Sequence, residues 1–207
     1  MVESDPTVQT PPSTAANDLP EAEAVEKESS KNRAVPAWVT IVAFLILAGF
    51  LTMLALGLRN SQQGPIQIGQ AVPPISLTSF EGQTYQTQDY AGKVIVLNFW
   101  ASWCKPCESE AAELEQAWQN YKPGGDVIFL GADYVDTEPE ARGYLSKFGI
   151  TYPNGPDLGT RISQTFRIKG VPETYIIGKN GTLAHAQIGP FNSVAEIISI
   201  IDTIRNQ

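Results

Sequence analysis

The chain has 207 residues, of which 43% are hydrophobic and 17% are charged, as expected for a globular domain with an additional segment. Its net charge of −8 argues against a nucleic-acid partner, because binding to phosphates requires clustered lysine and arginine. Two cysteines are too few for a disulfide scaffold, so the fold must depend on a hydrophobic core.

Residues 1–34 are rich in proline, serine, threonine, alanine and glutamate and contain few large apolar side chains. Such a segment cannot bury enough apolar surface to offset its conformational entropy, so we expect a disordered tail. A solvated tail without a specific role is favoured over a binding tail.

The following run is uncharged between Arg33 and Arg59. Residues 37–58 would extend about 33 Å as a helix, enough to cross a bilayer core of about 30 Å. The run has no polar stripe, and Trp38 lies near one end, where interfacial aromatic residues are common. It is longer than the apolar core of a signal peptide, so we predict an uncleaved signal-anchor helix.

The charges around this span predict its orientation. Three cations precede it and one follows closely: Lys27, Lys31, Arg33 and Arg59. Cations favour the cytoplasmic side of a membrane, so the amino-terminal tail is expected in the cytoplasm. The apolar span itself is expected to contact membrane lipid. Residues 59–66 would then be a linker and residues 67–207 an extracytoplasmic domain, where disulfides persist.

In that domain, strand and helix patterns alternate. Residues 74–80 and 83–87 flank Glu81-Gly82 and predict a hairpin. Further strands are expected at 94–100, 127–134, 174–178 and 183–189, the last two joined by an Asn-Gly turn. Helices are expected at 108–121, 138–149, 159–166 and 193–204. This order predicts an α/β fold with helices around a mixed central sheet.

The only two cysteines, Cys104 and Cys107, are expected in the first turn of a helix. There, free N–H groups and the helix dipole favour a thiolate at Cys104, while Cys107 is more shielded. One attacking and one resolving thiol are what thiol–disulfide exchange requires. Pro106 suits a first helical turn, and Lys105 should lower the pKa of the Cys104 thiol.

Three other interpretations of the cysteine pair are less favoured. A metal site needs two more ligands, and the single histidine, His185, is distant in the sequence and expected to be an exposed strand residue. A haem attachment site needs histidine after Cys107, where Glu108 stands. A structural disulfide that closes so short a loop would constrain the unfolded chain little. We therefore predict a redox pair without metal or cofactor.

Two motifs carry a resemblance to a known group: "FWASWCKPC" and, about 65 residues later, "GVPETYIIGKNG". Over residues 68–206 the chain resembles the membrane-anchored thioredoxin-like thiol–disulfide oxidoreductases of bacteria, called the redoxin, TlpA, ResA or DsbE group. The resemblance implies a thioredoxin-like fold with an amino-terminal β-hairpin extension. It also implies a single-pass protein of the bacterial inner membrane.

The resemblance also implies roles for individual residues. Cys104 would be the solvent-accessible nucleophile and Cys107 the resolving cysteine, with Trp103 beside them. Pro172 matches a cis-proline that turns the backbone of Val171 toward an incoming peptide.

Two acidic positions match the group as well. Glu173 resembles a variant of the cytochrome c maturation branch, and Glu110 matches a residue that tunes cysteine reactivity. Alternatively, Glu110 belongs to an ordinary acidic helix face. The dipeptide Lys105-Pro106 differs from that of many relatives, which leaves the direction of electron flow open. Phe99, Trp100 and Phe129 are expected in the core.

The favoured function is reduction of disulfides in exported proteins, with apocytochrome c as the client before haem attachment. Electrons would come from a membrane thiol-electron transporter, because the sequence has no dinucleotide-binding motif. The alternatives are general disulfide oxidation or isomerisation, peroxide reduction as in peroxiredoxins, and a non-catalytic apocytochrome chaperone.

Overall fold

The structure is a computed structural model that describes residues 36–61 and 64–207. The expected tail at residues 1–34 and two residues of the expected linker lie outside the described residues. The chain divides into two units, Met1–Gly57 and Leu58–Gln207, which are described separately.

The first unit contains most of the helix α1 (Ala37–Ser61), up to Gly57. Its segment Ala37–Gly57 is uncharged and is long and apolar enough to cross a membrane. Large apolar side chains are exposed along it, among them Trp38, Phe44 and Leu51. Because a soluble helix normally shows a polar face, this helix is a candidate membrane span.

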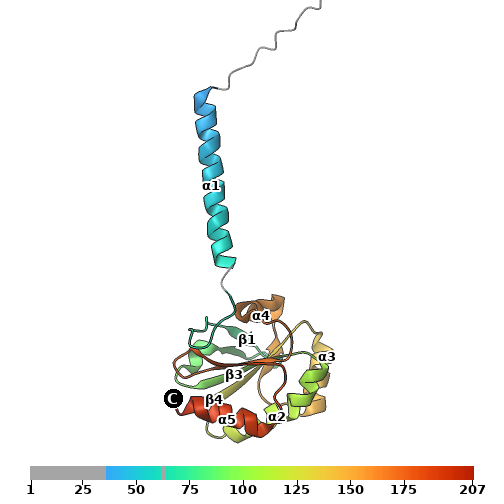
Figure 1. Ribbon diagram of the computed structural model, residues 1–207. Coiled ribbons are helices and arrows are strands. Elements are labelled where there is room, and N and C mark those ends of the chain that lie inside the picture. Colours follow the sequence, from blue (N-terminus) through green and yellow to red (C-terminus); the bar gives the residue numbers. More distant parts are fainter. Residues whose placement is uncertain (1–35, 62–63) are drawn as a thin grey trace, which may run out of the picture. The chain divides into compact units, whose positions relative to one another are not determined.

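The second unit is built around a five-stranded sheet with the strand order β5-β4-β3-β6-β7 (Figure 1). On one side of β3, strand β4 is parallel to β3 and β5 is parallel to β4. On the other side, β6 is antiparallel to β3 and β7 is antiparallel to β6. The sheet is therefore mixed, as expected. Its strands are β3 (Val94–Trp100), β4 (Val127–Asp133), β5 (Asn154–Pro156), β6 (Glu173–Ile177) and β7 (Leu183–Ile188).

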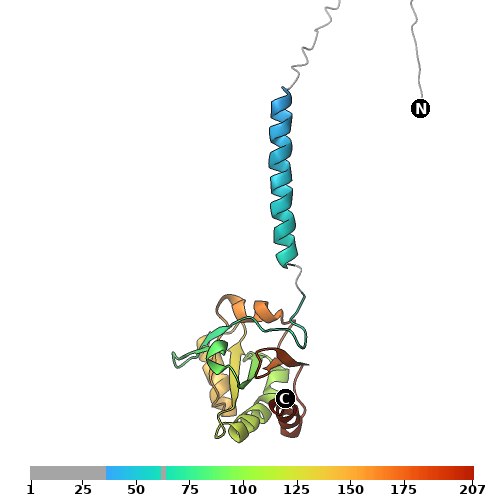
Figure 2. The same ribbon diagram turned by 90° about the vertical axis from the view of Figure 1, so that its left-hand side faces the viewer.

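Helices cover both faces of this sheet, with α2 and α5 on one face and α4 on the other (Figures 1 and 2). The α-helices are α2 (Lys105–Tyr121), α3 (Glu138–Phe148), α4 (Arg161–Phe166) and α5 (Val194–Arg205). The 3₁₀ helices are η1 (Thr87–Tyr90) and η2 (Leu158–Thr160). Strand β5 and helix η1, which are very short, were not predicted.

Side chains of β3 alternate between two cores, and all seven of its residues are buried. Val96 packs in the core under α2 and α5, whereas Leu97 and Phe99 pack in the core under α4. The predicted core positions are confirmed, because Phe99, Trp100 and Phe129 are at most 2% exposed. A strand buried on both faces holds the segment that follows it in a fixed place.

The predicted hairpin is formed by β1 (Ser76–Thr78) and β2 (Thr84–Gln86), which are antiparallel. Gly82 in its turn has φ of 86°, a conformation that glycine adopts without strain. Leu77 is buried in the same core as Ile162 of α4. The hairpin thus extends the thioredoxin-like fold over the α4 face.

The expectation that His185 is exposed is wrong. Its side chain is half-buried, and its Nε2 is buried without a hydrogen-bond partner in the part of the chain that the structure describes. His185 pairs with Ile176 across the sheet, and directly opposite residues share a face. Ile176 belongs to the core under α5, so His185 faces that helix rather than solvent.

Candidate active site

Helix α2 places the two cysteines in one turn. Cys104 is the N-cap residue of the helix, and Cys107 lies in its first turn, where the two form a disulfide with 5.3 Å between their Cα atoms. The N–H of Cys107 donates to Sγ of Cys104 at 3.1 Å. The helix begins at Lys105, which confirms the predicted helix start at the cysteine pair, and Pro106 fits a first turn whose N–H groups have no partner inside the helix.

Both sulfurs lie in a mostly apolar setting. Cys104 is 4% exposed and Cys107 1% exposed, so Cys104 is less accessible in the oxidised protein than expected. Both belong to a cluster with Trp100 and Tyr144, whose rings stack at 4.5 Å. Val171 packs against the same cluster from the segment before β6. Any charge on these sulfurs would be poorly solvated.

Trp103 and Lys105 project outward from the cysteine segment. Trp103 is 58% exposed, and its indole Nε1 donates to the carbonyl of Val135 at 3.1 Å. The Lys105 ammonium contacts Oε1 of Glu108 at 3.2 Å, as does Lys147 of α3 at the same distance. Hydrogen bonds from these two ammonium groups lower the pKa of Glu108. The positive charge of Lys105 is thus partly neutralised by Glu108.

The predicted cis-proline lies beside this cluster. The Val171–Pro172 peptide bond is cis, as expected. The Pro172 carbonyl accepts a hydrogen bond from the N–H of Gly189 at 3.0 Å, which ties the segment to the end of β7. The structure therefore brings Val171, though 64 residues after Cys107 in the sequence, into the cysteine cluster.

Glu110 is buried, not part of an exposed acidic face, with 1% of its side chain accessible. Its two carboxylate oxygens accept hydrogen bonds from Asn98 Nδ2 at 3.0 Å and from the N–H of Phe191 at 2.9 Å. Burial raises its pKa to about 7, although these two hydrogen bonds act in the opposite direction. Glu110 follows Cys107 by three residues, so both lie on the same helix face about 5–6 Å apart at Cβ.

Glu173 lies on the α4 face of the sheet, whereas Glu110 belongs to α2 on the opposite face. Its Oε1 accepts from the N–H groups of Lys169 and Gly170 at 2.8 and 3.2 Å, and its Oε2 accepts from the Tyr175 hydroxyl at 2.6 Å. Tyr175 belongs to the core under α4. Glu173 thus shapes the loop before Pro172 and does not join Glu110.

A contribution from the loop between β4 and α3 was not foreseen from the sequence. Asp136 in this loop accepts hydrogen bonds from the N–H and hydroxyl of Ser102 at 2.6 and 2.9 Å. Asp133, at the end of β4, is 2% exposed, and burial and the Asp136 carboxylate raise its pKa to about 7. One signal was available: the carboxyl ends of neighbouring parallel strands lie together, so residues after β4 adjoin those after β3.

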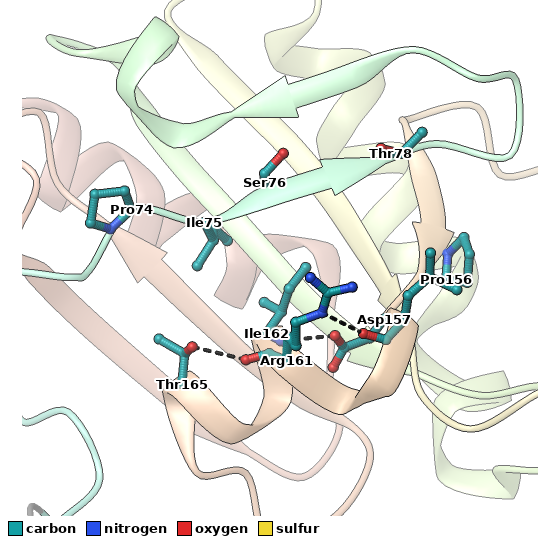
Figure 3. A pocket seen from close by; sticks show the side chains of 10 residues that line it. Pro74, Ile75, Ser76, Thr78, Pro156, Asp157, Arg161, Ile162 and Thr165 are labelled. Atoms are coloured by element: carbon teal, nitrogen blue, oxygen red, sulfur yellow. Dashed lines mark hydrogen bonds between the residues drawn. The ribbon is translucent and has the colours of Figure 1, made fainter. Parts of the chain in front are cut away.

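A cavity of about 340 Å³ lies on the α4 face of the sheet, between β1 and the segment from β5 to α4 (Figure 3). Ile75 and Ile162, which belong to the core under α4, are among its apolar lining residues, and Arg161 donates from Nε to the Leu158 carbonyl at 3.2 Å. Asp157 lines it as well. None of the lining residues belongs to the cysteine cluster, so this cavity is separate from the redox site.

The described residues include no group of three or more histidine, cysteine, aspartate or glutamate side chains placed to hold a metal ion. The cysteine site itself offers the chemistry of a buried cysteine pair at a helix amino terminus, flanked by a carboxyl group with a pKa near neutrality.

Comparison with known proteins identifies the family. Residues 68–186 match the model of the AhpC/TSA family. The chain belongs to this family. It is 31% identical to the thiol-disulfide oxidoreductase ResA of Bacillus cereus over 150 residues, which covers 72% of this chain and 86% of ResA. With its cysteine pair and thioredoxin-like fold, the chain is a thiol–disulfide oxidoreductase of the ResA type.

Solved structures agree with the thioredoxin-like fold. A putative thiol:disulfide interchange protein DsbE from Chlorobium tepidum has a TM-score of 0.62 at 22% identity, covering 68% of this chain and 99% of the other. A putative thioredoxin from Neisseria meningitidis has a TM-score of 0.60 at 26% identity, covering 66% of this chain and 90% of the other. The first of these supports the fold alone.

Proposed function

We propose that this protein is a membrane-anchored protein-disulfide reductase whose catalytic domain lies outside the cytoplasm of a bacterial cell. Its clients are exported proteins, foremost apocytochrome c before haem attachment. The apolar helix Ala37–Gly57 supports the anchor, and the excess of cations before it supports an amino terminus in the cytoplasm. The burial of the two sulfurs supports reduction, rather than oxidation, of client disulfides as the direction of the reaction.

Burial of the sulfurs removes the thiolate stabilisation that would otherwise favour the dithiol form over the disulfide. A neutral disulfide loses little by burial, whereas a thiolate at Cys104, which is 4% exposed, is poorly solvated. Desolvation raises thiol pKa values by up to about 3–5 pH units at fully buried sites. The helix terminus opposes this with about 0.3–1 kcal/mol at exposed positions. Because the larger effect keeps the buried pair a neutral dithiol at neutral pH, the reduced form lacks the thiolate stabilisation that makes a strong oxidant, so the protein should donate electrons.

The catalytic cycle follows from the roles of the two cysteines. The Cys104 thiolate attacks one sulfur of a client disulfide, and the other client sulfur leaves as a thiolate that takes a proton from water. The resulting mixed disulfide joins Cys104 to the client. Cys107 then attacks Sγ of Cys104, which releases the second client thiolate and forms the Cys104–Cys107 disulfide. Cys104 has given its proton to water before the attack, and Cys107 gives up its own in the second step. The pair therefore loses two electrons and two protons, and the client, whose thiolates are protonated in turn, gains the same number.

Glu110 is proposed as the proton acceptor in the second step. The Cys107 thiol must lose its proton before it attacks, and Glu110 lies one helical turn away with a pKa of about 7. A carboxyl group with this pKa can accept a proton at neutral pH and return it when the pair is reduced again. The reduction itself would draw on two electrons from a membrane thiol-electron transporter.

Residues around the pair are proposed to hold the client. Val171, which packs against the cysteine cluster, would offer its backbone to an extended client segment. Trp103, exposed beside Cys104, would contact its side chains. Glu173 would support this surface from within the domain, because its carboxylate accepts hydrogen bonds from the N–H groups of Lys169 and Gly170 in the loop before Pro172.

The reduction potential of the Cys104–Cys107 pair tests this proposal. The full chain in mild detergent is equilibrated with glutathione or dithiothreitol buffers, and the thiols are quantified by alkylation and mass spectrometry. A reductase should have a potential near the ~−270 mV of thioredoxin or below. A value near the ~−120 mV of strong oxidants would show that the protein forms disulfides instead.

The client is tested separately in cells. A strain that lacks the gene should lose covalent haem from its exported c-type cytochromes, and an added small thiol should restore it. The Cys104→Ser variant should not restore cytochrome assembly. If this variant did so, the protein would act as an apocytochrome chaperone without redox chemistry.

A further inference from the structure

We propose that Asp136 is a positioning residue for the reactive cysteine Cys104 and that it acts through Ser102. The inference rests on the proposed function in that Cys104 is the attacking cysteine. Asp136 lies in the loop between β4 and α3, 32 residues after Cys104 in the sequence, and belongs to no motif of the cysteine segment.

The carboxylate of Asp136 joins two loops. Its Oδ2 accepts from the N–H of Ser102 at 2.6 Å, and its Oδ1 accepts from the Ser102 hydroxyl at 2.9 Å. Oδ1 also accepts from the N–H of Thr137, in its own loop, at 2.9 Å. Both oxygens thus accept from a backbone N–H, a pattern that a carboxylate can satisfy fully and an amide cannot, because an amide nitrogen does not accept.

Two further hydrogen bonds connect the same loop to the cysteine segment. The N–H of Tyr134 donates to the carbonyl of Trp100 at 2.8 Å, and the indole of Trp103 donates to the carbonyl of Val135 at 3.1 Å. Three consecutive loop residues therefore contact three of the four residues that precede Cys104. Ser102 lies in the middle of this segment, and its partner, Asp136, is the only charged residue among the three loop residues.

The loop is held in an unfavourable backbone conformation. Val135 has φ of 51°, in the left-handed region that β-branched residues rarely adopt. Its side chain is 62% exposed, so apolar packing does not stabilise this conformation. Such strain persists only where surrounding contacts impose it, and here the contacts are those to the cysteine segment.

The contacts bear on the geometry of Cys104. Its N–H donates to the carbonyl of Ala101 at 3.2 Å, in a turn that includes Ser102. That turn places Sγ of Cys104 where it accepts from the N–H of Cys107. In the reduced protein this N–H would stabilise a Cys104 thiolate. If Ser102 is released, the thiolate loses part of this stabilisation and the pKa of Cys104 rises.

The pKa of Cys104 is measured directly in the test. The full chain in mild detergent carries Cys107→Ser, so that one thiol remains, and its alkylation by iodoacetamide is followed as a function of pH. Asp136→Ala should raise the pKa by roughly half a pH unit, an about threefold lower thiolate fraction below the pKa. Asp136→Asn, which keeps one acceptor, should raise it less.

The sign of the change separates positioning from simple charge. If the negative charge of Asp136 mattered by itself, both variants would lower the pKa of Cys104, and the proposal would be overturned. Unchanged profiles would overturn it as well. If Asp136→Ala does not fold, the isosteric Asp136→Asn takes its place, because its amide can accept from only one of the two backbone N–H groups. A pKa of Cys104 that does not rise in this variant would again refute the role of Asp136.

Asp157 provides a matched control. It also accepts from two backbone N–H groups, those of Ile162 and Ser163, both at 2.8 Å, and it is 6% exposed. Asp157→Ala should therefore destabilise the fold in a similar way yet leave the alkylation profile unchanged. An equal pKa rise in this control would show that general destabilisation explains the effect. The assay needs neither a client nor the disulfide, so it can support or refute the role of Asp136 whichever direction of electron flow the reduction potential shows.

Discussion

Glu110→Gln should change how the stability of this protein depends on pH. The pKa of Glu110 is about 7 in the folded protein, against 4.5 for a solvated glutamate. The folded state therefore holds a proton between pH 4.5 and 7 that the unfolded state has already lost. The free energy of unfolding must then fall as the pH rises through this window.

The size of the effect follows from the pKa difference. At about 1.4 kcal/mol per pH unit, the 2.5-unit difference corresponds to about 3 kcal/mol. Glutamine does not titrate, so this loss is absent in the variant. Its amide nitrogen instead faces one of two donors, Asn98 or the N–H of Phe191, at a cost of about 1–3 kcal/mol at every pH. The variant should thus be less stable than the wild type at pH 4.5 and about equally stable at pH 8.

Urea titrations of the oxidised proteins, followed by tryptophan fluorescence at pH 4.5 to 8, measure this difference. Glu113→Gln is the control, because it makes the same substitution on the same helix at a position that is not fully buried. Its difference from the wild type should be small and should vary little with pH. A stability difference for Glu110→Gln that stays constant over the whole range would refute the assignment of a raised pKa to a buried Glu110.

Three further predictions concern other parts of the domain. Asp133→Asn should gain stability relative to the wild type as the pH rises from about 4 to 7, because burial raises the pKa of Asp133 to about 7. Urea titrations at both pH limits measure this gain, and a stability difference that is the same at both would contradict it. Leu77→Ala should lower the free energy of unfolding by about 2–5 kcal/mol, because Leu77 is 1% exposed; a loss below 1 kcal/mol would show that the hairpin does not pack as described. Cys104→Ser should abolish insulin-disulfide reduction while circular dichroism stays that of the wild type, whereas residual turnover above the background rate would point to another nucleophile.

Local sequence patterns determined the first level of organisation. The uncharged run that forms α1, the buried strand β3 and the hairpin at Gly82 all follow from composition and short-range periodicity. The position of Cys104 and Cys107 at a helix start also follows from their spacing and from Pro106. These features depend on neighbours within a few residues, so physical reasoning from the sequence reaches them.

Only the tertiary structure decided how distant residues surround the cysteines. Glu110 is a buried carboxyl that accepts a hydrogen bond from the backbone of Phe191, 81 residues later. Ser102 meets Asp136 across 34 residues because β3 and β4 run parallel and end at the same edge. His185 is covered because it pairs with Ile176 beneath α5. Such contacts are set by strand order and helix packing, which no local pattern specifies.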